Sequence, residues 1–181
     1  MLHRTSIPRA SGHPPSVDTR WASRRAEPTP ASRWKATLPL LAAGGVSIGA
    51  GGLVAAVTGP THWDNGSWVA AFLVLVAGVA QIGVAAGQAQ LAPIAATTAF
   101  TAAECASWNA GCMTILAGTL LSSPVAVSIG SALLVAALGM SAFAIRGSGC
   151  QPRLLLWLYR ALLIVLVVSI PIGIALSWAR H

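Results

Sequence analysis

The feature that most constrains this chain is a long stretch without positive charge. Between residues 36 and 145 there is no lysine or arginine, and the only acids are Asp64 and Glu104. A soluble domain carries roughly 25% charged residues, whereas this chain has 8% charged and 55% hydrophobic residues. Because such a stretch cannot supply the surface of a water-soluble domain, the sequence predicts an integral membrane protein and argues against a soluble globular enzyme.

Five apolar segments lie within this stretch and just after it. Each is long enough to cross ~30 Å of hydrocarbon as a helix that rises 1.5 Å per residue. We therefore expect an all-α, polytopic transmembrane bundle that forms one domain over residues 36–181. The expected spans are 36–58, 65–89, 102–121, 124–145 and 153–178. The uncharged segment 91–101 has the least defined ends, and the sequence does not decide whether it is a loop or a helix.

The net charge of +7 gives an orientation once the charges are placed along the chain. Seven of the 11 basic residues fall in residues 1–35. We expect this polar segment to be a disordered cytoplasmic tail, or the result of a start codon assigned too far upstream. The positive-inside rule then places Arg146, Arg153 and Arg160 in the cytoplasm and the C-terminus outside. The charge therefore predicts no nucleic-acid partner, and the strong preference for arginine over lysine suggests a bacterial plasma membrane.

Two helix starts carry recognisable capping patterns. Ser123-Pro124 is typical of an N-cap serine followed by a proline at the first helical position. Thr101 and Glu104 have the spacing of a capping box, in which the glutamate reaches back to the start of the helix. These patterns predict helix starts near residues 102 and 124. Separately, Tyr159 near the start of the last span is expected at the inner lipid interface, where aromatic residues are common.

Small residues indicate where helices approach each other. Lipid provides no hydrophobic drive for association, so close contact at glycine and alanine replaces it. The first span contains Gly45 and Gly49 four residues apart, and the second contains Gly83 and Gly87 at the same spacing. We expect the first two helices to pack along these faces.

Four polar residues in the spans are the candidate functional side chains, because polar groups are costly in a bilayer. Gln81 and Gln88 share a helix face and are candidates for interhelical hydrogen bonds or for a pathway lining. Glu104 is a candidate proton or cation site, with the capping box as the alternative role. Asn109 lies about one and a half turns beyond Glu104 and is a candidate interhelical or substrate contact.

No catalytic or metal-binding set is visible in the sequence. His62 has no second histidine near it to complete a haem or copper site, and Cys105 and Cys112 are expected to act as small apolar groups. No pair of carboxylates falls in one compartment, since Asp64 and Glu104 are predicted on opposite sides of the membrane. We therefore expect no metal, no cofactor and no enzymatic activity.

Part of the chain resembles a known family. Ala80-Gln81-Ile82, Thr98-Ala99-Phe100-Thr101 and then Trp108 are similar to the second-to-third-helix region of the acetate uptake transporter family, a likeness confined to residues 78–108. Those proteins are six-spanning carriers of short carboxylates, so the resemblance implies solute transport. The chain departs from that family in having five expected spans and in lacking its Asn-Pro-x-Pro-Leu-Gly-Leu motif, so no binding residue is carried over.

The sequence thus favours two kinds of function. One is a carrier or channel for a small solute, of unknown identity, that uses the intramembrane polar residues. The other is a non-catalytic subunit or assembly factor of a larger membrane complex, which the small size and the glycine-rich faces favour. Besides the lipid bilayer, the expected partners are other membrane subunits or further copies of the chain.

Overall fold

The computed structural model describes residues 30–92, 97–146 and 153–179, and within these ranges every long element is a helix and no strand occurs. In chain order the elements are α1 (Pro30–Thr61), α2 (Gly66–Phe72), η2 (Leu73–Ala80), α3 (Gln81–Leu91), α4 (Thr98–Leu120), α5 (Pro124–Ala144) and α6 (Arg153–Ala179). The prediction of an all-α chain is therefore confirmed. Residues 1–29 of the expected tail lie outside the described residues, and residues 30–35 belong to α1.

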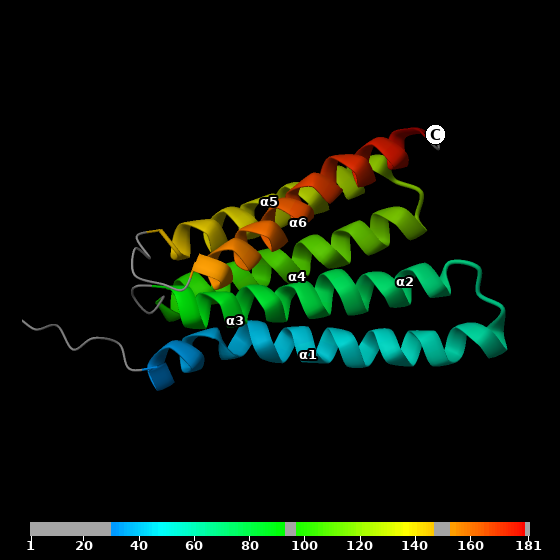
Figure 1. The fold of residues 1–181 in the computed structure, drawn as a ribbon. Coiled ribbons are helices and arrows are strands. Elements are labelled where there is room, and N and C mark those ends of the chain that lie inside the picture. The colour runs from blue at the N-terminus through cyan, green and yellow to red at the C-terminus, as the bar shows by residue number, and fades with distance from the viewer. Residues whose placement is uncertain (1–29, 93–96, 147–152, 180–181) are drawn as a thin grey trace, which may run out of the picture.

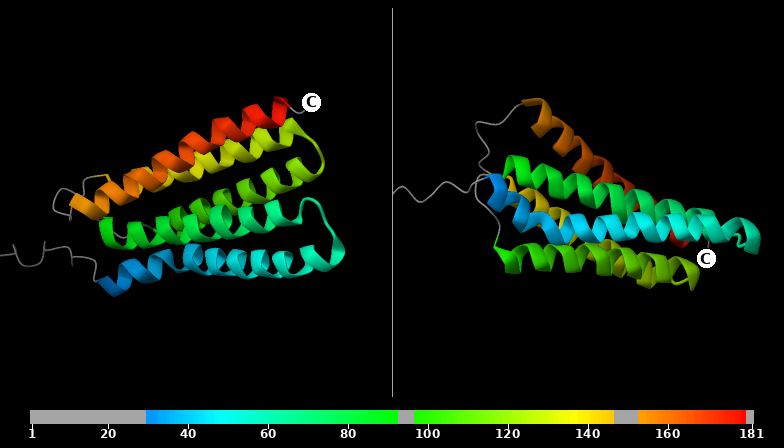
Figure 2. Two further views of the ribbon diagram at one scale, coloured as in Figure 1. Left: turned by 45° about the vertical axis from the view of Figure 1, so that its right-hand side comes forward. Right: turned by 90° about the horizontal axis from the view of Figure 1, so that it is seen from below.

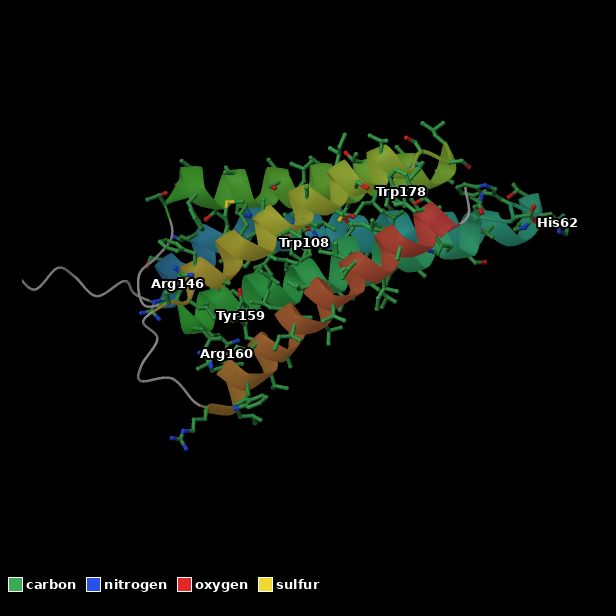
Figure 3. All side chains as sticks on the ribbon, turned by 90° about the horizontal axis from the view of Figure 1, so that it is seen from above. His62, Trp108, Arg146, Tyr159, Arg160 and Trp178 are labelled. Carbon is green, nitrogen blue, oxygen red and sulfur yellow. The ribbon has the colours of Figure 1, made fainter. Side chains whose placement is uncertain are left out.

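The helices lie side by side in an elongated bundle with two distinct ends (Figure 1). One end, here the basic end, carries the described basic residues Arg33, Lys35, Arg146, Arg153 and Arg160 near helix starts and ends. The other, the His62 end, carries the connections between α1 and α2 and between α4 and α5. Figure 3 shows Arg146 and Arg160 at one end and His62 and Trp178 at the other.

Among the described residues, four helical stretches are long and apolar enough to cross a membrane. They are Ala31–Thr61, Gly66–Leu91, Pro124–Ala144 and Arg153–Ala175, so α2, η2 and α3 act as one continuous rod. The fifth helix, α4, runs alongside them but is less apolar, because it contains Glu104, Asn109 and several threonines. The membrane class of the chain is therefore supported, while the count of five spans stays a prediction.

One of the two capping predictions is confirmed and the other is wrong. Ser123 is the N-cap of α5, where its hydroxyl accepts a hydrogen bond from the Ala126 amide and Pro124 opens the helix. The cap of α4 is Thr97, whose hydroxyl accepts from the Phe100 amide. Because α4 begins one turn earlier than expected, Thr101 and Glu104 lie inside the helix and form no capping box.

The first two helices do approach closely, but along other glycines than those predicted. A Cβ atom added at Gly44 would meet Ile82 and the Gly78 carbonyl, whereas Gly45 and Gly49 have no neighbour within 4 Å. The prediction for Gly45 and Gly49 is therefore wrong by one helical position, because Gly44, not Gly45, faces the partner helix. Gly44 and Gly78 form the close contact instead.

Gly83 and Gly87 also face a different helix from the one expected. A Cβ atom added at Gly83 would lie 3.1 Å from Leu162, and one added at Gly87 would overlap the ring of Tyr159. Both partners belong to α6, so this glycine pair provides the space for α6 to cross α3. The views in Figure 2 show α6 crossing the bundle at an angle to its neighbours.

The tightest pairing joins α4 and α5, which are connected by a short turn. Gly111 and Gly130 each bring the backbone of the other helix so close that a Cβ atom on either would lie under 3.0 Å from a carbonyl oxygen. The Ser107 hydroxyl donates to the Leu133 carbonyl at 2.8 Å, which fixes the register of the pair. The hairpin is thus held by glycine contacts together with polar bonds between the two helices.

The rod formed by α2, η2 and α3 contains a π-helical segment, Leu73–Ala80. A π-helix has i→i+5 hydrogen bonds and is wound less tightly than an α-helix, and such segments are frequent at functional sites. This segment lies between the tryptophan-bearing turn around Trp68 and the glutamine-bearing turns of α3.

Candidate functional site

The centre of the site is Glu104, which is fully buried in the bundle. Its Oε1 atom accepts a hydrogen bond from Gln88 Nε2 at 2.5 Å and lies in close hydrogen-bond contact with the Ser141 hydroxyl. These partners come from α3 and α5, so the carboxyl group joins three helices. Of the two expected roles for Glu104, the helix cap is therefore wrong, and the buried site remains.

The Ser141 hydroxyl has more contacts than its one hydrogen can serve. Besides its contact with Glu104, it donates to the Ala137 carbonyl at 2.9 Å. If that hydrogen goes to Ala137, the contact with Glu104 needs a proton on the carboxyl group. Among the described residues no cation forms an ion pair with Glu104, and its other oxygen, Oε2, is buried without a partner. The buried carboxyl group is therefore a candidate site for a proton.

Tyr159 completes the cluster from α6. Its hydroxyl donates to the Ser141 carbonyl at 3.2 Å, and its ring fills the hollow above Gly87. With an exposed fraction of 3%, the residue does not lie at the lipid interface, so that prediction is wrong. The angled course of α6 turns this face of the helix inward. Figure 3 shows Tyr159 near the basic end, on the side of Trp108 away from His62.

The other two candidate residues meet at Cys105 rather than at Glu104. Gln81 donates to the Cys105 thiol at 3.8 Å, and Asn109 donates to the Cys105 carbonyl at 2.8 Å. The thiol itself donates to the Pro39 carbonyl of α1 at 3.7 Å. Cys105 is thus a polar junction of three rods, whereas Cys112 is buried in the apolar core as predicted.

A layer of apolar side chains covers the cluster on the side of the His62 end. Trp108 lies one helical turn from Glu104 on the same face of α4, and Leu138 lies one turn from Ser141 on α5. Both belong to the main core together with Val84 and Ala137. On the other side, Leu91, Ile145 and Tyr159 form a second core cluster. The carboxyl group is thus closed off in both directions.

Beyond the apolar layer lies a cavity of about 600 Å³. It extends from Trp108 and Leu138 to Asn65 and Ser122 at the His62 end, and is walled by residues of α2, η2, α4, α5 and α6. This volume falls in the ~300–1,000 Å³ range of small-molecule sites. The cavity therefore ends one helical turn above the Glu104 cluster.

Three residues of the site were missed by the sequence analysis: Trp108, Ser141 and Tyr159. A signal existed for Ser141, because Glu104 and Ser141 are equally far along the chain from the Ser122–Ser123 turn. Residues equidistant from a tight turn face each other across an antiparallel hairpin. No comparable signal identified Tyr159, since its position depends on the crossing of α6.

His62, for which the sequence showed no second ligand, lies apart from this site. It is exposed in the connection between α1 and α2, where its backbone has a φ of 50°. No group of three or more potential metal ligands occurs among the described residues. Cys150 lies outside the described residues.

Comparisons of the chain with protein-family models, with curated proteins and with solved structures give no match. The case for a function therefore depends on the geometry of the cavity and of the Glu104 cluster.

Proposed function

We propose that this protein is a carrier or channel for a small solute. The observation that carries the proposal is the order of the cavity, the apolar layer and the carboxyl cluster along the bundle axis. A cavity at the His62 end stops at Trp108, and a buried carboxyl cluster lies directly beneath it. Carriers commonly place a binding site near the middle of the membrane, closed on one side at a time. A buried acid at that depth is a functional candidate by default.

The proposed orientation places the basic end in the cytoplasm and the cavity on the outer face. All five described basic residues lie at one end of the bundle, which is the arrangement that the positive-inside rule favours. For this topology α4 has to cross the membrane as a fifth span. Its polar residues Glu104 and Ser107 make hydrogen bonds to neighbouring helices, which lowers the cost of placing this less apolar helix in lipid.

Flux in reconstituted vesicles tests the proposal. Purified protein in proteoliposomes is exposed to gradients of acetate, the cargo type that the family resemblance implies, or of glycerol and benzamide as uncharged solutes. Solute entry is followed by light scattering. The variant Ser131→Leu places a larger side chain at the cavity wall, and Ala132→Leu adds the same side chain on the exposed face of α5.

The carrier proposal expects flux of at least one of these solutes above that of empty vesicles. Ser131→Leu should reduce it at least tenfold, and Ala132→Leu should leave it unchanged. Equal loss in both variants, or rates equal to empty liposomes for every solute, would contradict the proposal.

A second candidate function is that of a subunit in a larger membrane assembly. Gly45, Gly49, Gly52 and Gly59 lie along one face of α1, and none has a neighbour within 4 Å. Such a face permits close approach of another helix, either from a second copy or from a different subunit. Native mass spectrometry after mild detergent extraction tests this: a single monomeric species would contradict it.

A further inference from the structure

The cavity has a composition that restricts what it can hold. None of the residues that line it is charged, although it reaches Asn65 and Ser122 at the His62 end of the bundle. Most of its wall is apolar and includes aromatic side chains, such as Trp68 and Phe72, which stack at 5.5 Å between ring centres. A charged ligand in this cavity would lose its hydration without gaining a counter-charge, which is strongly unfavourable.

Two hydrogen-bonding groups of the lining residues have no partner. Ser131 is nearly buried and lines the cavity, and no hydrogen bond joins its hydroxyl to another described residue. Trp108 is fully buried and closes the cavity; its indole Nε1–H is also unpartnered within the described part of the chain, but this atom has no surface accessible from the cavity. Buried polar groups without partners are uncommon and call for an explanation.

A lipid chain is a poor explanation for these groups. A hydrocarbon tail would satisfy the apolar wall but would leave the Ser131 hydroxyl unpaired. The cavity also reaches Asn65 at the His62 end of the bundle rather than being confined to the apolar middle.

We propose that the cavity binds an uncharged amphipathic molecule, whose ring or hydrocarbon body contacts Trp68 and Phe72 and whose hydrogen-bonding end meets Ser131. This inference rests on the proposed transport function and names its substrate class. It departs from the short carboxylates that the family resemblance implies. The hydroxyl of Ser131 can donate a hydrogen bond, and a carbonyl oxygen on the ligand would accept it.

The test uses three probes of similar size on the full-length protein in lipid nanodiscs. Benzamide is uncharged and has a carbonyl acceptor, benzoate is its charged counterpart, and toluene has the ring without an acceptor. Each is titrated while the indole N–H signals of the seven tryptophans are followed by ¹⁵N NMR. The variant Trp108→Phe assigns the Trp108 signal.

Benzamide is expected to shift the Trp108 signal in a saturable way, because Trp108 closes the end of the cavity, and to bind at least tenfold more tightly than benzoate. Toluene is expected to compete with benzamide but to bind more weakly, because it has no acceptor for the Ser131 hydroxyl. Ser131→Leu should abolish the effect, and Ala132→Leu should preserve it.

Equal binding of benzoate, equal binding of toluene, or no saturable shift with benzamide would each overturn the inference. If Ser131→Leu does not fold, competition by toluene still locates the probe in the apolar cavity. Binding without flux would retain the ligand class and remove the carrier proposal. Flux of acetate without benzamide binding would do the reverse.

Discussion

Gln88 Nε2 and Glu104 Oε1 lie 2.5 Å apart across the interface of α3 and α4, in a part of the bundle that water does not reach. The hydrogen bond joins two helices that are consecutive in the chain, and Ser141 extends it to α5. A carboxyl oxygen in this position accepts hydrogen bonds whether the group is charged or protonated. The pair therefore acts as a structural link and as a potential proton site at the same time.

Replacing Glu104 should separate these two roles. Glu104→Leu leaves the Gln88 amide without its acceptor, which should lower the free energy of unfolding by about 1–3 kcal/mol. Glu104→Gln keeps an oxygen acceptor for the Gln88 amide and should therefore cost less than Glu104→Leu. Thermal unfolding in one detergent, followed by circular dichroism, measures both.

A double-mutant cycle of Glu104→Leu with Gln88→Leu is the control for this link. Interhelical polar pairs in membrane proteins have coupling energies near 0.6 kcal/mol, with a maximum of about 1.7 kcal/mol. We expect a coupling within this range. A coupling of zero would mean that the bond contributes nothing to the stability of the bundle.

Gly87 should be intolerant of any side chain. Because a Cβ atom there would overlap the ring of Tyr159, Gly87→Ala should push α6 away from α3 and cost about 1–3 kcal/mol. Gly83→Ala is the matched control, since the atom it would meet is the flexible end of Leu162. Equal melting temperatures of the two variants would contradict the packing of the Tyr159 ring against Gly87.

The contact between α1 and the next rod offers a comparison of adjacent residues. Gly44→Leu should destabilise the protein by several degrees in melting temperature, since its side chain would meet Ile82 and the Gly78 backbone. Gly45→Leu points into open space and should melt within error of the unchanged protein. A larger effect at Gly45 would show that this face is covered by a partner in the detergent-extracted protein.

Chemical labelling tests the orientation of the bundle. In sealed right-side-out vesicles, a membrane-impermeant maleimide should react with His62→Cys, which is exposed at the His62 end. A cysteine at Arg146, exposed at the basic end, should react only after the vesicles are opened. The free thiols Cys105 and Cys112 are at least partly buried, and replacing Cys150 with serine removes the remaining cysteine. The reverse pattern would invert the proposed topology.

The sequence predicted the helices far better than their contacts. Hydropathy and the Ser123-Pro124 pattern located the helical segments to within a few residues, apart from the longer α1. Which face of a helix meets a neighbour was harder, because faces rich in glycine and alanine look alike from the sequence. Gly44 and Gly45 differ only in direction, and that direction depends on the whole bundle.

The candidate site was partly predictable for the same reason. Gln88 and Glu104 stood out because glutamine and glutamate are rare in apolar helices, whereas serine and tyrosine are common there. Ser141 and Tyr159 gained their positions only from the pairing of α4 with α5 and from the crossing of α6. The cavity has no sequence signature, since it is a space between helices.

The π-helical segment Leu73–Ala80 has a consequence for the spacing of residues along its rod. Trp68, Phe72 and Val76 line the cavity, while Val84 and Gln88 continue the same step of four residues towards the Glu104 cluster. In an α-helix of 3.6 residues per turn, each such step overshoots a full turn by about 40°. The slower winding of the π segment offsets part of this drift, so cavity and cluster share one face of one rod. If residues 73–80 were wound as a regular α-helix, the drift would return and Gln88 would turn away from the face that carries the cavity residues, with every side chain of the site still present in the chain.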